Sequence, residues 1–216
     1  MRRARWPEVA PVRFLALGDS YTIGEGVTEA GRWPVQLVAR LREHGIAVDA
    51  PRIVATTGWT TDELSAAMDD AALKPGWALV TLLIGVNDQY RGRPAAGYRE
   101  RFLGLLRRAV DLAGDVRRVV VVSIPDWGVT SFAEGRDRTA IANEIDTFNA
   151  IARDETLRAH ARWVDVTPTS RDAAANPGML VDDGLHPSAA QYARWVTLIA
   201  PAAEAALRER GTPNAA

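Results

Sequence analysis

Four short segments of the chain carry residues that suit nucleophilic catalysis. They are centred on Ser20, Gly58, Asn87 and the run Asp183-Gly184-Leu185-His186. A serine hydroxyl is a poor nucleophile near neutral pH and needs a base within hydrogen-bond reach. His186 is the natural candidate because an imidazole titrates near that pH. The residue types therefore suggest a serine nucleophile with a histidine as its general base.

A carboxylate must orient such a histidine and stabilise the imidazolium that forms during attack. Asp183 precedes His186 by three residues, and in a turn leading into a helix this spacing lets the carboxylate reach back to the ring. Asp182 is the adjacent competitor. A turn or helix-cap role would also suit Asp183, since aspartate is common at both positions.

The tetrahedral intermediate of acyl transfer needs hydrogen-bond donors for its oxyanion. The backbone N–H of Ser20, the backbone N–H of Gly58 and the side-chain amide of Asn87 are candidates. Taken singly, Gly58 also suits a plain β–α turn, and Asn87 suits an Asx turn or a helix cap. The hypothesis of an oxyanion hole depends on the segments occurring together.

Several other kinds of site are excluded by the sequence. The run 18–25 has no lysine after Gly24, and Glu25 in that place would repel phosphate. No Gly-x-Ser-x-Gly motif surrounds Ser20. The chain has no cysteine and no histidine pair on one helix face, so we expect no metal site. His44 and His160 fall at the ends of expected helices, where a structural role is favoured.

The bulk properties are those of an ordinary globular protein. The chain has 216 residues and a formal net charge of -1. Without a basic block we expect no nucleic-acid partner, and without a long apolar run we expect no stable membrane anchor and a cytoplasmic location. We expect an N-terminal extension over residues 1–12, one domain over 13–210 and a frayed tail over 211–216.

Short β-type runs alternate with longer helical patterns along the chain. The expected strands are Arg13–Leu17, Arg52–Ala55, Ala78–Ile84, Val119–Ile124 and Trp163–Val166. They are mainly apolar without alternation, as parallel strands covered on both faces are. Apolar stripes at helical spacing predict helices near residues 33–41, 64–71, 98–112, 141–152 and 192–203. The pattern predicts an α/β protein, a three-layer α/β/α sandwich.

In such a sheet, the loops that follow the strands share one edge. Ser20 follows the first expected strand, Gly58 the second and Asn87 the third. The loop with Asp183 and His186 follows the fifth. We therefore expect the four segments to meet.

In these four segments the chain resembles the SGNH hydrolases, also called the GDSL esterase/lipase family. The first segment is Gly18-Asp19-Ser20-Tyr21, in which Tyr21 stands in the place of the leucine of the family name. The resemblance covers residues 13–191 and selects Asp183 over Asp182 as the catalytic aspartate. It implies a five-stranded parallel sheet of flavodoxin-like order and no cofactor. It also implies hydrolysis of esters or thioesters through an acyl-serine intermediate.

The resemblance implies a serine esterase that acts on a small-molecule ester, with Ser20, Asp183 and His186 as the catalytic residues. We expect short- to medium-chain acyl esters as substrates. A carbohydrate O-deacetylase, a thioesterase, a lysophospholipase, an acyltransferase and a non-catalytic binding module on the same fold remain as alternatives. We expect the loop aromatics Trp59, Trp127 and Phe132 to help line the substrate pocket.

Three charged residues near the same edge have two possible roles. Arg91 and Arg93 could attract an anionic substrate, although a solvated surface role is the simpler interpretation. Asp126 is a rival carboxylate near the edge, and we interpret it as a turn residue.

Overall fold

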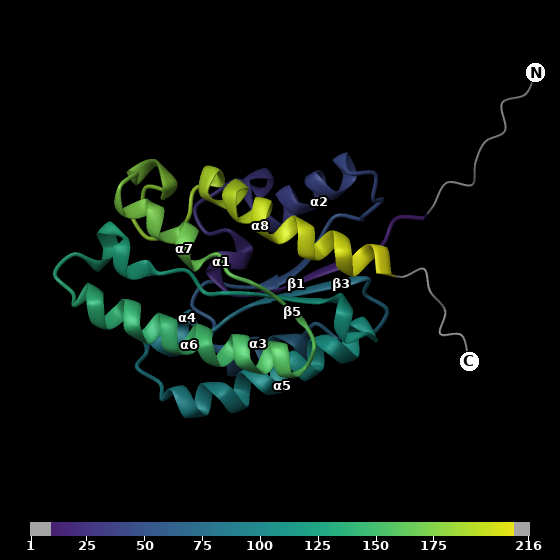
Figure 1. Cartoon of the computed structure of the whole chain (residues 1–216), viewed down its shortest axis with the longest axis horizontal. Helices are drawn as coiled ribbons and strands as arrows, with labels where there is room; N and C mark the ends of the chain where they lie inside the picture. The colour runs from purple at the N-terminus through teal and green to yellow at the C-terminus, as the bar shows by residue number, and fades with distance from the viewer. Residues whose placement is uncertain (1–9, 210–216) are drawn as a thin grey trace, which may run out of the picture.

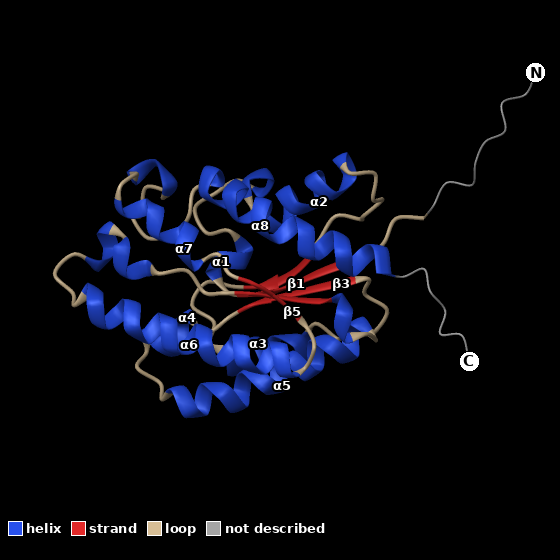
Figure 2. Cartoon of the chain, in the orientation of Figure 1, coloured by secondary structure: helices blue, strands red, loops and turns tan. Residues whose placement is uncertain are grey.

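A computed structural model describes residues 10–209 of the chain. One sheet lies between two layers of helices (Figure 1). One layer contains α2 (Trp33–Glu43) and α8 (Ala189–Arg208), and the other contains α3 (Thr61–Asp70), α5 (Ala95–Ala113) and α6 (Arg138–Arg158) (Figure 2). The three-layer α/β/α arrangement predicted from the alternating pattern is therefore confirmed.

Five parallel strands form the sheet in the order β2-β1-β3-β4-β5. They are β1 (Phe14–Gly18), β2 (Arg52–Ala55), β3 (Leu79–Leu83), β4 (Val119–Val122) and β5 (Arg162–Val164). The number of strands and the flavodoxin-like order agree with expectation, and the strand boundaries differ from it by at most two residues. In this order the direction of winding reverses between β1 and β3, and ligands bind at the carboxyl ends of the strands beside that reversal.

The register of the sheet sets the level at which the first three strands end. Gly18 at the end of β1 is paired with Ala55 of β2 and with Leu83 of β3. All three strands thus finish side by side, and the segments that follow them begin at one edge. This register is the physical reason why residues far apart in sequence meet there.

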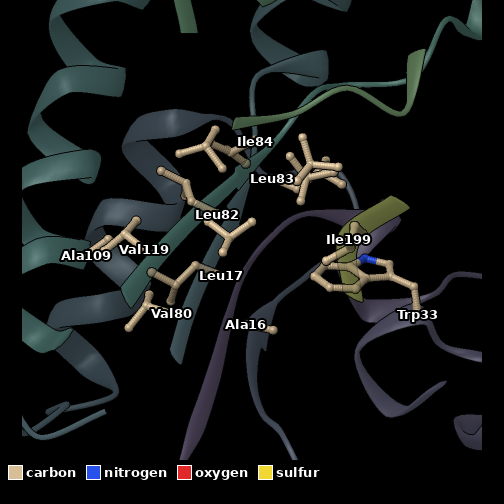
Figure 3. Packing of buried hydrophobic residues seen from close by; sticks show 14 of the residues in the cluster. Ala16, Leu17, Trp33, Val80, Leu82, Leu83, Ile84, Ala109, Val119 and Ile199 are labelled. Atoms are coloured by element: carbon tan, nitrogen blue, oxygen red, sulfur yellow. The ribbon is translucent and has the colours of Figure 1, made fainter. Parts of the chain in front are cut away.

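The core explains why the strands are mainly apolar without alternation. Every residue of β1 and β3 is buried, because helices cover both faces of the sheet. On one side, Trp33 of α2 lies beside Ile199 of α8, and both are fully buried (Figure 3). Burying one such side chain contributes about 1.5–3 kcal/mol. The buried central strands therefore hold the ends of the loops that follow them in fixed positions.

The long helices occur where the apolar stripes predicted them. At the start of α3, Thr60 and Glu63 form the expected capping box, in which the Glu63 carboxylate accepts the Thr60 N–H at 2.8 Å. Ser188 caps α8 through its hydroxyl, which accepts the N–H of Gln191 at 3.4 Å. Capping satisfies N–H groups that have no partner within the helix.

Three single-turn helices were not predicted. They are α1 (Ser20–Ile23), α4 (Val86–Tyr90) and α7 (Thr167–Ser170). A segment of four or five residues is too short to show a helical period. Two of them, α1 and α4, begin directly after β1 and β3 and carry predicted site residues.

The expected terminal segments lie largely outside the described residues. Of the expected extension 1–12, only 10–12 are described, and Val12 there forms a parallel bridge with Val48. The expected tail 211–216 lies outside as well. Among residues 10–209, no helix has the length and apolar character needed to cross a membrane.

Candidate active site

Ser20 is the first residue of α1, directly beyond the end of β1. Asp19 caps this turn, and its Oδ1 accepts the N–H of Tyr21 at 3.0 Å. Gly24 ends the turn in a left-handed conformation, with φ of 75°. The side chain of Ser20 lines an open pocket at the carboxyl edge of the sheet. A sharp strand-to-helix turn thus places Ser20 at the carboxyl edge of the sheet, where the sequence predicted it.

Gly58 and Asn87 come to the same pocket from two different loops. Gly58 has a φ of +86°, a backbone conformation that residues with a Cβ rarely adopt. Asn87 lies in the first turn of α4, and its Nδ2 donates to the carbonyl oxygen of Trp59 at 2.9 Å. An amide nitrogen carries two hydrogens, so one remains for a ligand in the pocket.

Asp183 and His186 share one turn between β5 and α8. The Asp183 Oδ2 lies 2.6 Å from the His186 Nδ1, and Oδ1 accepts the backbone N–H of Leu185 at 2.8 Å and of His186 at 2.9 Å. Partial burial raises the pKa of Asp183, but the hydrogen bonds from His186 and Leu185 outweigh it and hold the pKa below its usual value. The carboxylate is therefore ionised at neutral pH and holds the ring by Nδ1.

The pocket brings together Ser20, Gly58, Asn87 and His186. With Nδ1 held by Asp183, Nε2 is the imidazole nitrogen left for proton transfer. The Tyr21 ring packs against the imidazole with a centroid separation of 5.7 Å. A serine, an oriented histidine and two amide donors around one open space are the parts that acyl transfer requires.

Comparison with known families gives a match to the GDSL-like lipase/acylhydrolase family over residues 16–194. The match covers most of the chain and includes all four segments. The chain belongs to this family. It is a hydrolase of the GDSL, or SGNH, type. A search of the curated proteins gives no match.

Solved structures of similar fold support the architecture of this GDSL-type hydrolase. A structure described as TesA superposes with a TM-score of 0.72 at 20% identity, covering 90% of this chain and 99% of that one. A lipase/acylhydrolase from Enterococcus faecalis has a TM-score of 0.69 at 21% identity, with 91% and 96% covered. Phospholipase A1 from Streptomyces albidoflavus NA297 has a TM-score of 0.67 at 19% identity, with 90% and 99% covered. These likenesses concern the fold.

The pocket of this hydrolase has a volume of about 160 Å³ and mainly apolar walls. Its side chains include Trp127 and Phe132, as expected, together with Tyr90, which the sequence did not single out. Trp59 is not among the lining residues, contrary to expectation. It lies just before the Thr60 cap, where its side chain packs on the core and only its carbonyl contacts Asn87.

The three aromatic rings of the pocket wall pack against one another. Trp127 makes edge contacts with Tyr90 and Phe132, at centroid separations of 5.4 and 6.0 Å. The guanidinium of Arg136 lies 5.3–5.4 Å from the centroid of each ring. The Trp127 Nε1 donates to Gln89 at 2.8 Å. The wall is thus a preformed surface whose side chains support one another.

The loop that carries Trp127 and Phe132 is hydrogen-bonded to the loop that carries the histidine. The carbonyl oxygen of Gly184 accepts the backbone N–H of Phe132 at 3.1 Å and the hydroxyl of Ser131 at 3.2 Å. A Cβ at Gly184 would lie 2.2 Å from that hydroxyl oxygen. A larger residue at 184 would therefore have to displace the Ser131 hydroxyl, and the φ of +66° there is one that favours glycine.

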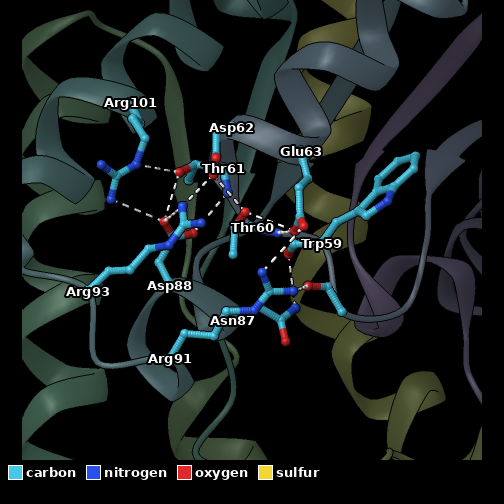
Figure 4. Close-up of polar contacts among 11 residues, drawn as sticks. Trp59, Thr60, Thr61, Asp62, Glu63, Asn87, Asp88, Arg91, Arg93 and Arg101 are labelled. Carbon is cyan, nitrogen blue, oxygen red and sulfur yellow. Dashed lines mark hydrogen bonds and ion pairs between the residues drawn. The ribbon is translucent and has the colours of Figure 1, made fainter.

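Arg91 and Arg93, the two arginines that the sequence placed near this edge, are paired with carboxylates. Arg91 pairs with Glu63, and Arg93 pairs with Asp62 and Asp88. These pairs belong to a network of polar contacts beside the Gly58 loop, which is the segment 56–60 between β2 and α3 (Figure 4). The pairing favours a structural role for both arginines over the capture of an anionic substrate.

Asp88 is the buried centre of this network. It is fully buried, and it accepts the backbone N–H of Thr61 at 2.8 Å and the Thr61 hydroxyl at 2.9 Å. Arg101 donates to it at 3.2 Å. Asp88 thus fixes the start of α3 to the start of α4. The sequence around Asp88 did not predict this role.

The rival side chains have other partners. Asp126 caps a short turn, with Oδ1 accepting the Gly128 N–H at 2.8 Å, and it pairs with Arg171 at 2.9 Å. His44 lies at the end of α2, and its Nδ1 is 2.5 Å from a carboxylate oxygen of Glu204 on α8. His160 lies at the end of α6 with a φ of 61°. None of these three residues lines the pocket of Ser20.

Proposed function

We propose that this protein is a serine esterase that hydrolyses short- to medium-chain carboxylic esters through an acyl-serine intermediate. The observation that carries the proposal is the convergence of Ser20, Gly58, Asn87 and His186 on one pocket, with His186 held by Asp183. Membership of the GDSL-like lipase/acylhydrolase family supports it.

The first half of the reaction acylates the enzyme. His186 takes the hydroxyl proton of Ser20 while Oγ forms a bond to the ester carbonyl carbon. The electron pair of the carbonyl moves to its oxygen, and the Ser20 and Gly58 N–H groups and the Asn87 Nδ2 bind this oxyanion. The oxyanion then collapses, the bond to the alcohol oxygen breaks, and His186 gives that oxygen the proton.

The second half releases the acid. A water molecule loses a proton to His186 and attacks the acyl carbon, forming a second oxyanion in the same position. Collapse breaks the bond to the Ser20 oxygen, which takes the proton back. Asp183 stays ionised throughout and stabilises the imidazolium in each half.

The dimensions of the pocket support a small acyl group. Its volume of about 160 Å³ is close to the ~150 Å³ of an engineered apolar cavity that holds one benzene molecule. A group of about six carbon atoms would therefore fill it. The apolar wall suits an acyl chain, and the open mouth leaves room for the alcohol portion.

Hydrolysis of p-nitrophenyl acetate by the wild type and by Ser20→Ala tests this function. We expect the variant to lose on the order of 10⁴-fold or more in kcat, because no other group replaces the nucleophile. A fluorophosphonate probe should label the wild type and leave Ser20→Ala unlabelled. Equal turnover by both proteins would contradict the proposal, and absence of labelling in the wild type would favour a binding module.

A series of esters distinguishes the remaining alternatives. We expect p-nitrophenyl esters of two to six carbons to be hydrolysed faster than those of twelve or more. Acetylated sugars, acyl thioesters, lysophospholipids and competing alcohol acceptors complete the series. A strong preference for one of these over the simple esters would identify an O-deacetylase, a thioesterase, a lysophospholipase or an acyltransferase, respectively.

A further inference from the structure

Asn87 of α4 and Arg91, the residue at the C-terminal cap of α4, bind consecutive carbonyl groups of the Gly58 loop. The Asn87 Nδ2 donates to the carbonyl oxygen of Trp59 at 2.9 Å, and the Arg91 Nη2 donates to that of Gly58 at 2.7 Å (Figure 4). The backbone N–H of Arg91 donates to the carbonyl of Asn87 at 3.1 Å, which sets the two side chains one helical turn apart.

Arg91 also reaches the far end of the same loop. Its Nη1 lies 3.3 Å from Oε1 of Glu63, whose Oε2 accepts the backbone N–H of Thr60 at 2.8 Å. One guanidinium therefore joins the Gly58 carbonyl to the cap of α3. The planar fork of arginine allows it to hold two acceptors in fixed directions, which a lysine ammonium does less well.

The space beside Gly58 itself is open, whereas its neighbours are held. The Trp59 N–H donates to the Thr56 carbonyl at 3.3 Å, and the Thr57 hydroxyl donates to Glu25. Gly58 has a φ of +86°, and the one heavy atom found within 4 Å of its possible Cβ position is Arg91 Nη2, at 3.9 Å. A glycine in open space has wide conformational freedom. Yet the donor that Gly58 would supply must point at one position, because an oxyanion hole works by being preorganised.

We propose that Arg91 is a positioning residue of the oxyanion hole. By holding the Gly58 carbonyl while Asn87 holds that of Trp59, it keeps the Gly58 N–H and the free hydrogen of the Asn87 amide directed at a common point. Arg91 acts through the loop and does not touch the reacting atoms. This inference rests on the proposed esterase function, and it extends that function to a residue outside the four family segments.

The first test is steady-state hydrolysis of p-nitrophenyl acetate by Arg91→Met, Arg91→Lys and Arg40→Met. We expect Arg91→Met to lower kcat about ten- to hundredfold with KM changed less than twofold. A misplaced donor reduces the stabilisation of the transition state and leaves the binding of the substrate nearly unchanged. Arg91→Lys should recover part of the loss. Arg40 pairs with Glu43 on the exposed surface of α2, so Arg40→Met should match the wild type.

A reversible inhibitor separates positioning from substrate contact. A short alkyl trifluoromethyl ketone forms a tetrahedral adduct with a serine, and its affinity should fall across the variants in proportion to kcat/KM. A change in KM at constant kcat would instead mean that Arg91 contacts the substrate, and this would overturn the proposal. So would a kcat within twofold of the wild type in Arg91→Met.

Amide hydrogen exchange tests the restraint without any turnover. Exchange over residues 56–63 should be faster in Arg91→Met than in the wild type, while Arg40→Met should leave it unchanged. Glu63→Gln, which keeps a capping side chain but removes the charge, should give a smaller effect of the same sign. Equal exchange in all proteins would overturn the inference even if the esterase function holds. Faster exchange in Arg91→Met than in the wild type, together with a wild type that hydrolyses no ester, would support the restraint and refute the esterase.

Discussion

Asp183 binds His186 twice, once at the ring and once at the backbone. Its Oδ2 lies 2.6 Å from Nδ1, and its Oδ1 accepts the backbone N–H of the same histidine at 2.9 Å. Both contacts follow from the separation of three residues within one turn. The aspartate therefore fixes the position of the histidine as well as its tautomer.

Replacing Asp183 by asparagine should impair proton transfer more than binding. An amide in this place can stabilise the wrong tautomer and cannot stabilise an imidazolium, so we expect kcat to fall by about 10²–10⁴-fold. The exposed neighbour provides the matched control, and Asp182→Asn should change kcat less than twofold. The measurement is steady-state hydrolysis of p-nitrophenyl acetate at pH 7–8. Equal losses in both variants would reopen the choice between the two aspartates.

Removing the side-chain donor of the oxyanion hole should act on the transition state. Asn87→Ala should lower kcat by about 10²–10³-fold, with a small change in KM, because the oxyanion exists only along the reaction path. The exposed residue Asn143 on α6 gives a control of the same type, and Asn143→Ala should behave as the wild type. A raised KM at unchanged kcat would place Asn87 in ground-state binding instead.

Shortening the exposed part of the aromatic wall should alter the acyl preference. Phe132 is 39% exposed, so its removal costs little stability while enlarging the pocket. We expect Phe132→Ala to shift the optimum of a p-nitrophenyl ester series toward longer acyl chains. Leu198 on α8 is 40% exposed and outside the pocket, so Leu198→Ala should leave the optimum unchanged. An unchanged optimum in both variants would show that the wall does not contact the acyl group.

The buried carboxyl of Asp19 should make stability depend on pH. Burial raises its pKa from 3.8 to about 8, and its Oδ2 has no hydrogen-bond partner in the described part of the chain. The folded state therefore holds this proton more tightly than the unfolded state does. Between pH 4 and 8 the unfolded chain ionises first, so Asp19 lowers stability by about 1.4 kcal/mol per pH unit as pH rises.

Asp19→Asn isolates this effect, because asparagine can still accept the Tyr21 N–H and does not ionise. Urea unfolding between pH 5 and 9 should show the variant gaining stability relative to the wild type up to about pH 8, with a constant difference above it. Parallel pH profiles of the two proteins would mean that the carboxyl is ionised when folded.

The sheet and the long helices were predictable because their signals extend over many residues. The mainly apolar, non-alternating runs of β1 and β3 indicated strands buried on both faces. Trp33, Leu37 and Leu41 repeat at helical spacing along α2. The order of the strands places the predicted residues on one edge. Their meeting in one pocket agrees with that expectation.

What was not predictable depends on partners distant in sequence or on very short elements. Nothing near Arg91 in sequence indicates that its guanidinium binds the Gly58 carbonyl 33 residues away. The turn α4 is too short to show which side Tyr90 faces. The inward packing of Trp59 depends on where α3 begins, and aromatic composition alone does not show this.

The contact of Phe132 and Ser131 with the carbonyl of Gly184 bears on how this enzyme could be adapted. The loop that carries Phe132 is hydrogen-bonded to the carbonyl oxygen of Gly184, in the turn that holds His186. Inserting or deleting residues in the 126–132 loop should therefore displace the turn of His186 together with the aromatic wall of the pocket. Libraries that vary side chains at constant loop length should yield active enzymes with new preferences far more often than libraries that vary the length.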